Sequence, residues 1–241
     1  HQQKKQRKNQ KNKEIMNTYN YRRTNQIIAA IIFLSSLIVY TLTMAPTTSF
    51  WDCGEFIAVS HTLGVPHPPG TPLYLLLGSV FSQIPLFTDI GARVNFLSPI
   101  ASALSVMFLY LITVQLIEKW RGKTYNISDA IIAYGSAFVG ALTFAFTDSH
   151  WFNAVEAEVY SISTFFTAIV VWLILKWEQS ENTDGNVKYI LIIAYILGLA
   201  TGIHLLNLLT LPFIALVIYF KKHSFSIPSF LSLMAITLGV F

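Results

Sequence analysis

The clearest chemical signal in the sequence is a pair of carboxylates, Asp52 and Glu55, in the segment FWDCGEF. Residues three apart lie on the same face of a helix, so we expect both acids to project to one side, beside apolar neighbours. A carboxylate near apolar surface and a second negative charge has a raised pKa and can act as a general base near neutral pH. The structural alternative is that Thr48 or Ser49 caps this helix and that Asp52 only favours its dipole.

Two basic groups follow in the same part of the chain. His67 lies in GVPHPPGTP, whose four prolines and two glycines predict a stiff, non-helical backbone. This histidine could be a ligand or an acid–base group, or it could satisfy a local carbonyl. Arg93, in GARVNF, could bind a phosphate with two parallel N–H groups, or it could be an ordinary arginine at the membrane interface.

Two more polar pairs lie further along the chain. Glu156 and Glu158 in WFNAVEAEVY are two apart, so they share a face only in extended chain, and we expect one of them to point into a site. His204 and Asn207 in GIHLLN lie within an apolar stretch. Polar groups at membrane depth are often functional, although a hydrogen bond between helices would explain this pair equally well.

The elements that position these groups are predicted to be membrane-spanning helices. The chain is 54% hydrophobic and only 12% charged, which excludes a soluble globular domain. Six apolar runs are long enough to cross about 30 Å of hydrocarbon, and a seventh begins near residue 227. The six runs are 27–45, 96–117, 130–147, 161–177, 189–203 and 205–220. We therefore predict an all-α polytopic membrane protein with the lipid bilayer as its solvent.

The distribution of lysine and arginine predicts the orientation of these helices. If residues 72–87, which are apolar but short, do not cross, fifteen of the sixteen basic residues lie on the cytoplasmic side. Residues 46–95 and 148–160 are then outer loops, the first containing juxtamembrane helices. Half of the basic residues belong to residues 1–25, predicted to be a disordered cytoplasmic tail rather than a nucleic-acid-binding segment, and residues 26–241 form the membrane module.

Four separated motifs, FWDCGEF, HPPGTP, WFNAVEAEVY and GIHLLN, give the chain a resemblance to a known family. Over residues 46–210 it resembles the protein O-mannosyltransferase-like membrane proteins of the type found in Bacteroidetes, a former domain-of-unknown-function family of the GT-C glycosyltransferase superfamily. The resemblance implies a GT-C-like N-terminal module, in which Asp52 is the catalytic base, Glu55 the accompanying acid, and Glu156 or Glu158 a second acid. Arg93 and His67 would bind the donor phosphate.

The same resemblance implies an activity and a location. The expected reaction transfers a sugar, most simply mannose, from a polyprenyl-phosphate donor to Ser or Thr hydroxyls of exported proteins. The expected location is the inner membrane of a bacterium, with a cytoplasmic N-terminus and a periplasmic active site. No organic cofactor is implied, but the acids could hold a divalent metal ion. A transporter or channel lined by His204 and Asn207, or a non-catalytic scaffold subunit, remains the alternative; scattered acids would favour the scaffold.

Overall fold

All elements in the described part of the chain are helices. The structure, a computed structural model, describes residues 2–124, 126–180 and 187–239. The first half contains α1 (Gln2–Thr43), α2 (Cys53–Thr62), α3 (Pro72–Gln83), α4 (Ile90–Asn95) and α5 (Leu97–Arg121). The second half contains α6 (Ile127–Ala130), the π-helical η1 (Ile131–Gly135), α7 (Ser136–Ala145), α8 (Asp148–Ala154), α9 (Val159–Gln179), α10 (Val187–Thr201), the 3-10 helix η3 (Leu205–Leu209), α11 (Thr210–Lys222) and α12 (Ile227–Leu238).

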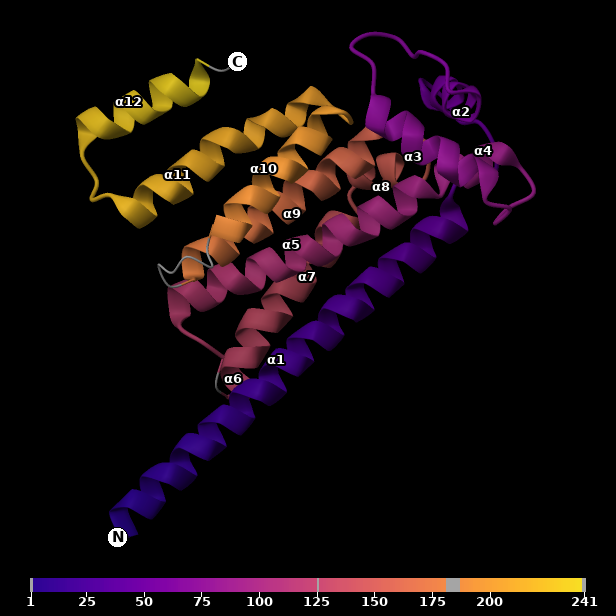
Figure 1. Cartoon of the computed structure of the whole chain (residues 1–241). Coiled ribbons are helices and arrows are strands. Elements are labelled where there is room, and N and C mark those ends of the chain that lie inside the picture. Colours follow the sequence, from indigo (N-terminus) through magenta and orange to yellow (C-terminus); the bar gives the residue numbers. More distant parts are fainter. Residues whose placement is uncertain (1, 125, 181–186, 240–241) are drawn as a thin grey trace.

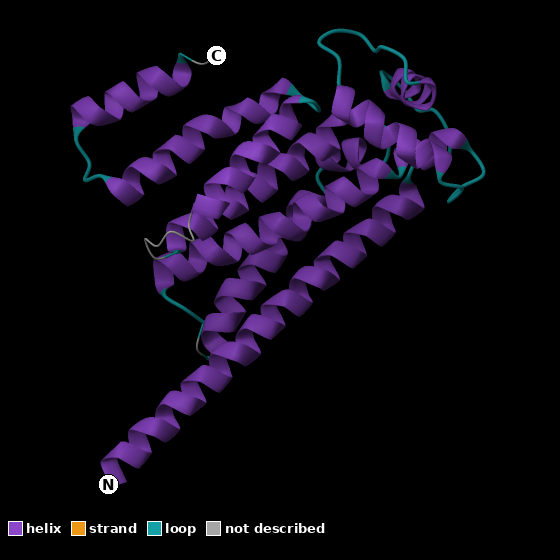
Figure 2. Cartoon of the chain, viewed as in Figure 1, coloured by secondary structure: helices purple, strands orange, loops and turns teal. Residues whose placement is uncertain are grey.

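Helix α5 lies at the centre of the bundle. It packs against α1, α7 and α9, and α9 in turn packs against α10 and α11. The long helices run roughly side by side, while the short helices α2, α3, α4 and α8 gather at one end (Figures 1 and 2). We call this end, which carries residues 46–95 and 148–160, the loop end. The prediction of an all-α polytopic membrane protein is confirmed.

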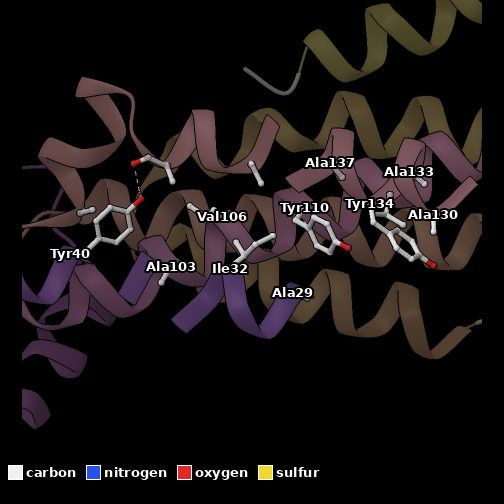
Figure 3. Close-up of a cluster of buried hydrophobic side chains, with 14 residues drawn as sticks. Ala29, Ile32, Tyr40, Ala103, Val106, Tyr110, Ala130, Ala133, Tyr134 and Ala137 are labelled. Atoms are coloured by element: carbon white, nitrogen blue, oxygen red, sulfur yellow. Dashed lines mark hydrogen bonds between the residues drawn. The ribbon is translucent and has the colours of Figure 1, made fainter. Parts of the chain in front are cut away.

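Small side chains let α1, α5 and α7 approach closely, as is usual where helices associate within a membrane. The cluster between them contains several buried alanines, including Ala29, Ala103 and Ala137 (Figure 3). The hydroxyl of Tyr40 crosses this cluster and donates to the carbonyl oxygen of Ala145 at 2.8 Å. A buried hydrogen bond of this kind contributes about 1 kcal/mol, and here it fixes the end of α1 against the end of α7.

Within the described residues, five helical segments are long and apolar enough to cross a membrane: Tyr21–Thr43, Ile90–Arg121, Ile127–Ala145, Val159–Gln179 and Leu205–Lys222. The predicted span over 189–203 corresponds to α10, which has 15 residues and is therefore about 22 Å long. The predicted seventh segment corresponds to α12, a shorter apolar helix of 12 residues. The five segments and the two shorter apolar helices together correspond to the seven apolar runs of the sequence, and within the described residues the five have the length of a complete span.

Residues 2–25 are helical, since α1 begins at Gln2, whereas a disordered tail was predicted over 1–25. No Pro or Gly interrupts the chain before Pro46, and Gln, Lys, Arg and Glu all have good helix propensity. The apolar half of α1 also supplies an established helical turn, so that continuing the helix avoids the cost of a new nucleus. Low hydrophobicity predicted the absence of a core here, but it did not exclude a helix.

Residues 72–87 do not cross the bundle, as predicted. Asn95 Nδ2 donates to the carbonyl oxygens of Ala45 and Thr47, both at 2.8 Å, so the two ends of the 46–95 loop lie together. A crossing between them would have placed these ends on opposite sides of a membrane. The helix in this stretch, α3, has 12 residues and packs against α2 and α4 at the loop end.

Candidate active site at the loop end

The first loop presents Asp52 at the start of α2. Asp52 occupies the N-cap position, but its side chain makes no capping hydrogen bond and is exposed. Trp51, immediately before it, has φ of 59°, a left-handed conformation that costs energy for a bulky residue. Neither Thr48 nor Ser49 occupies the N-cap position, but the Asp52 charge still lies at the N-terminal end of α2, where it favours the helix dipole. Since Asp52 makes no capping hydrogen bond, its carboxylate can also face a substrate.

Glu55 binds His67 rather than acting alone beside Asp52. Its two carboxylate oxygens accept from the His67 backbone N–H at 2.7 Å and face the His67 Nδ1 at 2.8 Å. These hydrogen bonds lower the pKa of Glu55, and the Glu55 side chain raises the pKa of His67. The pair therefore favours a carboxylate and an imidazolium. The proline-rich loop places a positive charge next to Asp52, which the order of residues alone did not reveal.

Asp52, Glu55 and His67 also form a group that could hold a divalent metal ion. One potential ligand atom from each residue lies within 4.8 Å of the others. Carboxylate oxygens and an imidazole nitrogen are suitable ligands for several divalent ions. A divalent ion bound by these acids stays a prediction, and this group is where it would bind.

The second loop contributes Glu158 to the site. Glu158 is the extended residue before α9, with φ of −136° and ψ of 145°, and its side chain is buried. Burial raises the pKa of Glu158 to about 7, with further contributions from the negative charges of Asp52 and Glu156. Glu156 itself is 1% exposed and does not line the cleft described next. Of the two acids, only Glu158 faces the cleft. The chain bends at residues 155–157, so it is not extended through both acids and they do not share a face.

A cleft at the loop end brings together three segments that are distant in the sequence. Asp52 and His67 come from the first loop, Glu158 and Tyr160 from the second, and His204 from the turn before η3. The remaining lining residues are Phe56, Pro69, Gly70, Thr71, Val159 and Ile203. Acids of both predicted outer loops therefore meet in one cleft.

His204 enters this cleft in a defined state. Its Nδ1 accepts from the backbone N–H of Leu206 at 3.1 Å, and its ring lies 5.2 Å from the ring of Tyr160. Burial lowers the pKa of His204, which favours the neutral imidazole. With Nδ1 accepting a hydrogen bond, the neutral ring carries its proton on Nε2, where it can donate to a bound hydroxyl or phosphate.

Another predicted site residue, Arg93, lies outside the cleft. Its guanidinium donates to the carbonyl oxygens of Phe87, Ser82 and Thr88 at 2.7, 3.1 and 3.2 Å. These bonds close the 84–89 loop against the end of α3. Because Arg93 does not line the cleft, the structure does not support the expected contact with a donor phosphate there. A long side chain near a helix can reach back along its own loop, which its position in the sequence did not indicate.

Asn207 likewise has a structural environment. Its Nδ2 donates to the carbonyl oxygens of Ala200 and His204, and its Oδ1 accepts from Thr167 at 3.2 Å. The residue is buried and does not line the cleft. The bonds to Ala200 and His204 hold the turn that carries His204. The bond from Thr167 of α9 is the hydrogen bond between helices that the structural alternative predicted.

Some cleft residues were not identified from the sequence. Tyr160 and Thr71 lie inside the motifs WFNAVEAEVY and HPPGTP, so the motifs contained them, but nothing in their residue type marked them. Gly70, with φ of 79°, occupies a conformation that favours glycine, and the PPGTP pattern is a signal for such a turn.

Sequence comparison identifies the family of the chain. The family described as the protein O-mannosyl-transferase TMEM260 N-terminal domain matches residues 52–226. The chain belongs to this family. The match begins at Asp52 and extends beyond His204, so every residue that lines the cleft falls within the TMEM260 N-terminal domain. The family resemblance inferred from the four motifs is confirmed.

Two curated relatives are similar to this chain over most of its length. It is 30% identical over 196 residues to "Protein O-mannosyl-transferase tmem260" of Dictyostelium discoideum, covering 76% of this chain and 22% of that protein. It is 29% identical over 169 residues to the Mus musculus protein of the same name, covering 70% of this chain and 22% of that protein. The chain therefore spans about a fifth of the length of these relatives. No solved structure gives a significant match.

The membrane setting is supported by the fold, whereas the cellular location stays a prediction. The five apolar helices support integral membrane character. Both of these curated relatives are eukaryotic, so they do not bear out a bacterial inner membrane or a periplasmic orientation of the cleft.

Proposed function

We propose that this chain forms part of the active site of a protein O-mannosyltransferase that uses a polyprenyl-phosphate sugar and acts on exported proteins. The observation that carries the proposal is the cleft at the loop end, where Asp52 and Glu158 from separate loops face the same space. The family name supports mannosyl transfer to protein. A scaffold subunit would have no need to bring these acids together.

The proposed chemistry is an inverting displacement. The hydroxyl oxygen of a Ser or Thr acceptor attacks the anomeric carbon of the sugar, and its proton passes to the Asp52 carboxylate. The bond between the anomeric carbon and the phosphate oxygen breaks at the same time, and the polyprenyl phosphate leaves with the bonding electrons. Asp52 is exposed at the start of α2 and makes no capping hydrogen bond, which suits its role as base.

The negative charge of the departing phosphate needs a positive partner. His67 is the cleft residue suited to this role, since its hydrogen bond to Glu55 favours the imidazolium. Glu55 would then orient His67 and maintain its charge. A carboxyl with a pKa of about 7 at Glu158 would exist partly protonated at neutral pH and could donate a hydrogen bond to the sugar or to the leaving group.

The experiment that tests this proposal measures mannose transfer from polyprenyl-phosphate mannose to a Ser/Thr peptide in membranes. The complete protein and its Asp52→Asn variant are compared at equal amounts of folded protein, with Asp148→Asn, which changes an exposed acid at the same end, as the control. We expect Asp52→Asn to lose at least about 100-fold in kcat and Asp148→Asn to change by less than about twofold.

Each result has a definite meaning for the proposal. Equal turnover by wild type and Asp52→Asn would remove the base assignment. No transfer by the wild type from this donor would overturn the proposed substrate. Loss of wild-type activity after chelation, restored by a divalent ion, would instead make Asp52 a metal ligand together with Glu55 and His67.

A further inference from the structure

We propose that Asn95 is the positioning residue of this site, holding the first-loop acid Asp52 and the second-loop acid Glu158 in fixed relation across the cleft. The inference deepens the proposed function and rests on it. Asn95 is the last residue of α4, is fully buried and does not line the cleft. Any effect on transfer must therefore act through the residues that it binds.

The side-chain amide of Asn95 uses its complete hydrogen-bonding capacity. Its Nδ2 donates to the carbonyl oxygens of Ala45 and Thr47, at 2.8 Å each. Its Oδ1 accepts from the backbone N–H of Ala157 at 2.9 Å and from the Cys53 thiol at 3.5 Å. An amide offers two N–H donors and one oxygen with two acceptor positions, so all four are occupied.

These partners lie next to the two acids in the chain. Cys53 directly follows Asp52, and Ala157 directly precedes Glu158. Cys53 and Ala157 are both fully buried and pack in one small cluster with Ile57 and Val94. Each acid is therefore one residue away from the same buried cluster, although more than a hundred residues separate the two acids in the chain.

A second hydrogen bond connects the same two loops, and we call their meeting point around Asn95 the junction. The backbone N–H of Ala45 donates to the carbonyl oxygen of Val155 at 2.8 Å, which joins the end of the first span to the second loop. The backbone N–H of Ser49 donates to the Cys53 sulfur at 3.4 Å. Asn95 thus lies at the point where the start of the first loop, its end, and the second loop meet.

Substitution of Asn95 has a predictable chemical consequence. Asn95→Asp keeps the shape but replaces both N–H donors with an oxygen that faces the carbonyl oxygens of Ala45 and Thr47. Asn95→Ala removes the donor from the partly buried bonds to those carbonyls and leaves the buried Ala157 N–H without its acceptor. Either change would let the two loops shift relative to each other, and a displacement of about 1 Å in an active site can cost about 100-fold in rate.

The first measurement compares kcat and KM of Asn95→Ala, Asn95→Asp and Tyr40→Phe in the complete protein, each corrected for the folded fraction. Tyr40→Phe is the matched control, because it also removes a buried hydrogen bond to a backbone carbonyl, but between α1 and α7 and away from the cleft lining. We expect the Asn95 variants to lose at least about 10-fold in kcat with KM for the donor changed less than about threefold. Losses no larger than those of Tyr40→Phe would overturn the proposal.

A double-mutant comparison separates positioning from simple loss of fold. If Asn95 acts by placing Glu158, the loss from Asn95→Ala should be at least about fivefold smaller in a Glu158→Gln background than in the wild type. Independent, multiplicative losses would contradict a positioning role.

A third readout does not depend on activity, and it keeps this inference distinct from the choice of donor. Hydrogen–deuterium exchange should rise in segments 45–53 and 155–158 of Asn95→Ala and stay unchanged there in Tyr40→Phe. Faster exchange in both segments, with no wild-type transfer from polyprenyl-phosphate mannose, would refute the donor and retain the junction. Unchanged exchange in Asn95→Ala would refute the junction, whatever the donor.

Discussion

Replacing Glu158 with glutamine should stabilise the protein above neutral pH. Burial raises the pKa of this carboxyl from 4.5 to about 7, and the charges of Asp52 and Glu156 add to the effect. Since a tenfold change in a protonation equilibrium corresponds to about 1.4 kcal/mol, the ionised side chain costs the folded state about 3 kcal/mol. A glutamine side chain would fill nearly the same volume without this charge.

The direction of the pH effect follows from where the proton is bound. Below pH 4.5, the Glu158 carboxyl is protonated in both the folded and the unfolded state, and it causes no penalty. As the pH rises from 4.5 to about 7, the unfolded chain releases this proton first, so the wild-type protein loses stability. Above about pH 7 the full loss of about 3 kcal/mol is present. The Glu158→Gln variant does not undergo this loss.

Thermal unfolding of the purified protein in detergent at pH 5, 6, 7 and 8 measures the effect. The midpoint of Glu158→Gln should exceed that of the wild type by an amount that grows with pH to several degrees at pH 8. Asp148→Asn, which removes an exposed acid at the same end, should show no such growth. A difference that stays constant with pH, or a less stable Glu158→Gln at pH 8, would refute the electrostatic reasoning.

The further predictions concern Arg93 at the loop end and two glycines, Gly78 in α3 and Gly140 in α7. Arg93→Lys should lower the thermal midpoint by an amount equivalent to about 1–3 kcal/mol, because an ammonium cannot replace the three-carbonyl fork, and should leave the donor KM within about twofold. A tenfold rise in KM with an unchanged midpoint would return Arg93 to phosphate binding. Gly78→Ala should destabilise the protein by about 1–3 kcal/mol, because the new methyl would lie 2.8 Å from Ser60 Cβ. Gly140→Ala, which meets no neighbouring atom, should instead stabilise the protein by about 0.5–1 kcal/mol, and equal midpoints for both glycine variants would contradict the close contact between α2 and α3.

The membrane fold could be predicted from the sequence because hydropathy and helix length are local properties. Five of the six complete predicted spans correspond to helical segments long enough to cross a bilayer, and the exception is 189–203. The exception is apolar but short, as α10 shows, because a composition window does not report where a helix ends. The N-terminal tail differed for a related reason, since polarity alone does not separate a solvated helix from disorder.

The candidate site could be predicted only in part. The residues Asp52, His67, Glu158 and His204 were identified by type and motif, and they do meet in one cleft. Arg93 was identified on the same chemical grounds, yet its guanidinium donates to carbonyl oxygens of the 84–89 loop and of the end of α3. Residue type shows what a side chain can bind, whereas its partners depend on the path of the backbone around it.

The sequence by itself determined that this protein lies in a membrane, that it belongs with O-mannosyltransferase-like proteins, and which acids are candidates for catalysis. Only the tertiary structure decided which of Glu156 and Glu158 faces the cleft, that Glu55 pairs with His67, and that Asn95 joins the two loops. The physical reason is that hydropathy and propensity act between near neighbours in the chain. Burial, pKa and hydrogen-bond partners arise largely from contacts between segments far apart in the sequence, which only the packed helices bring together.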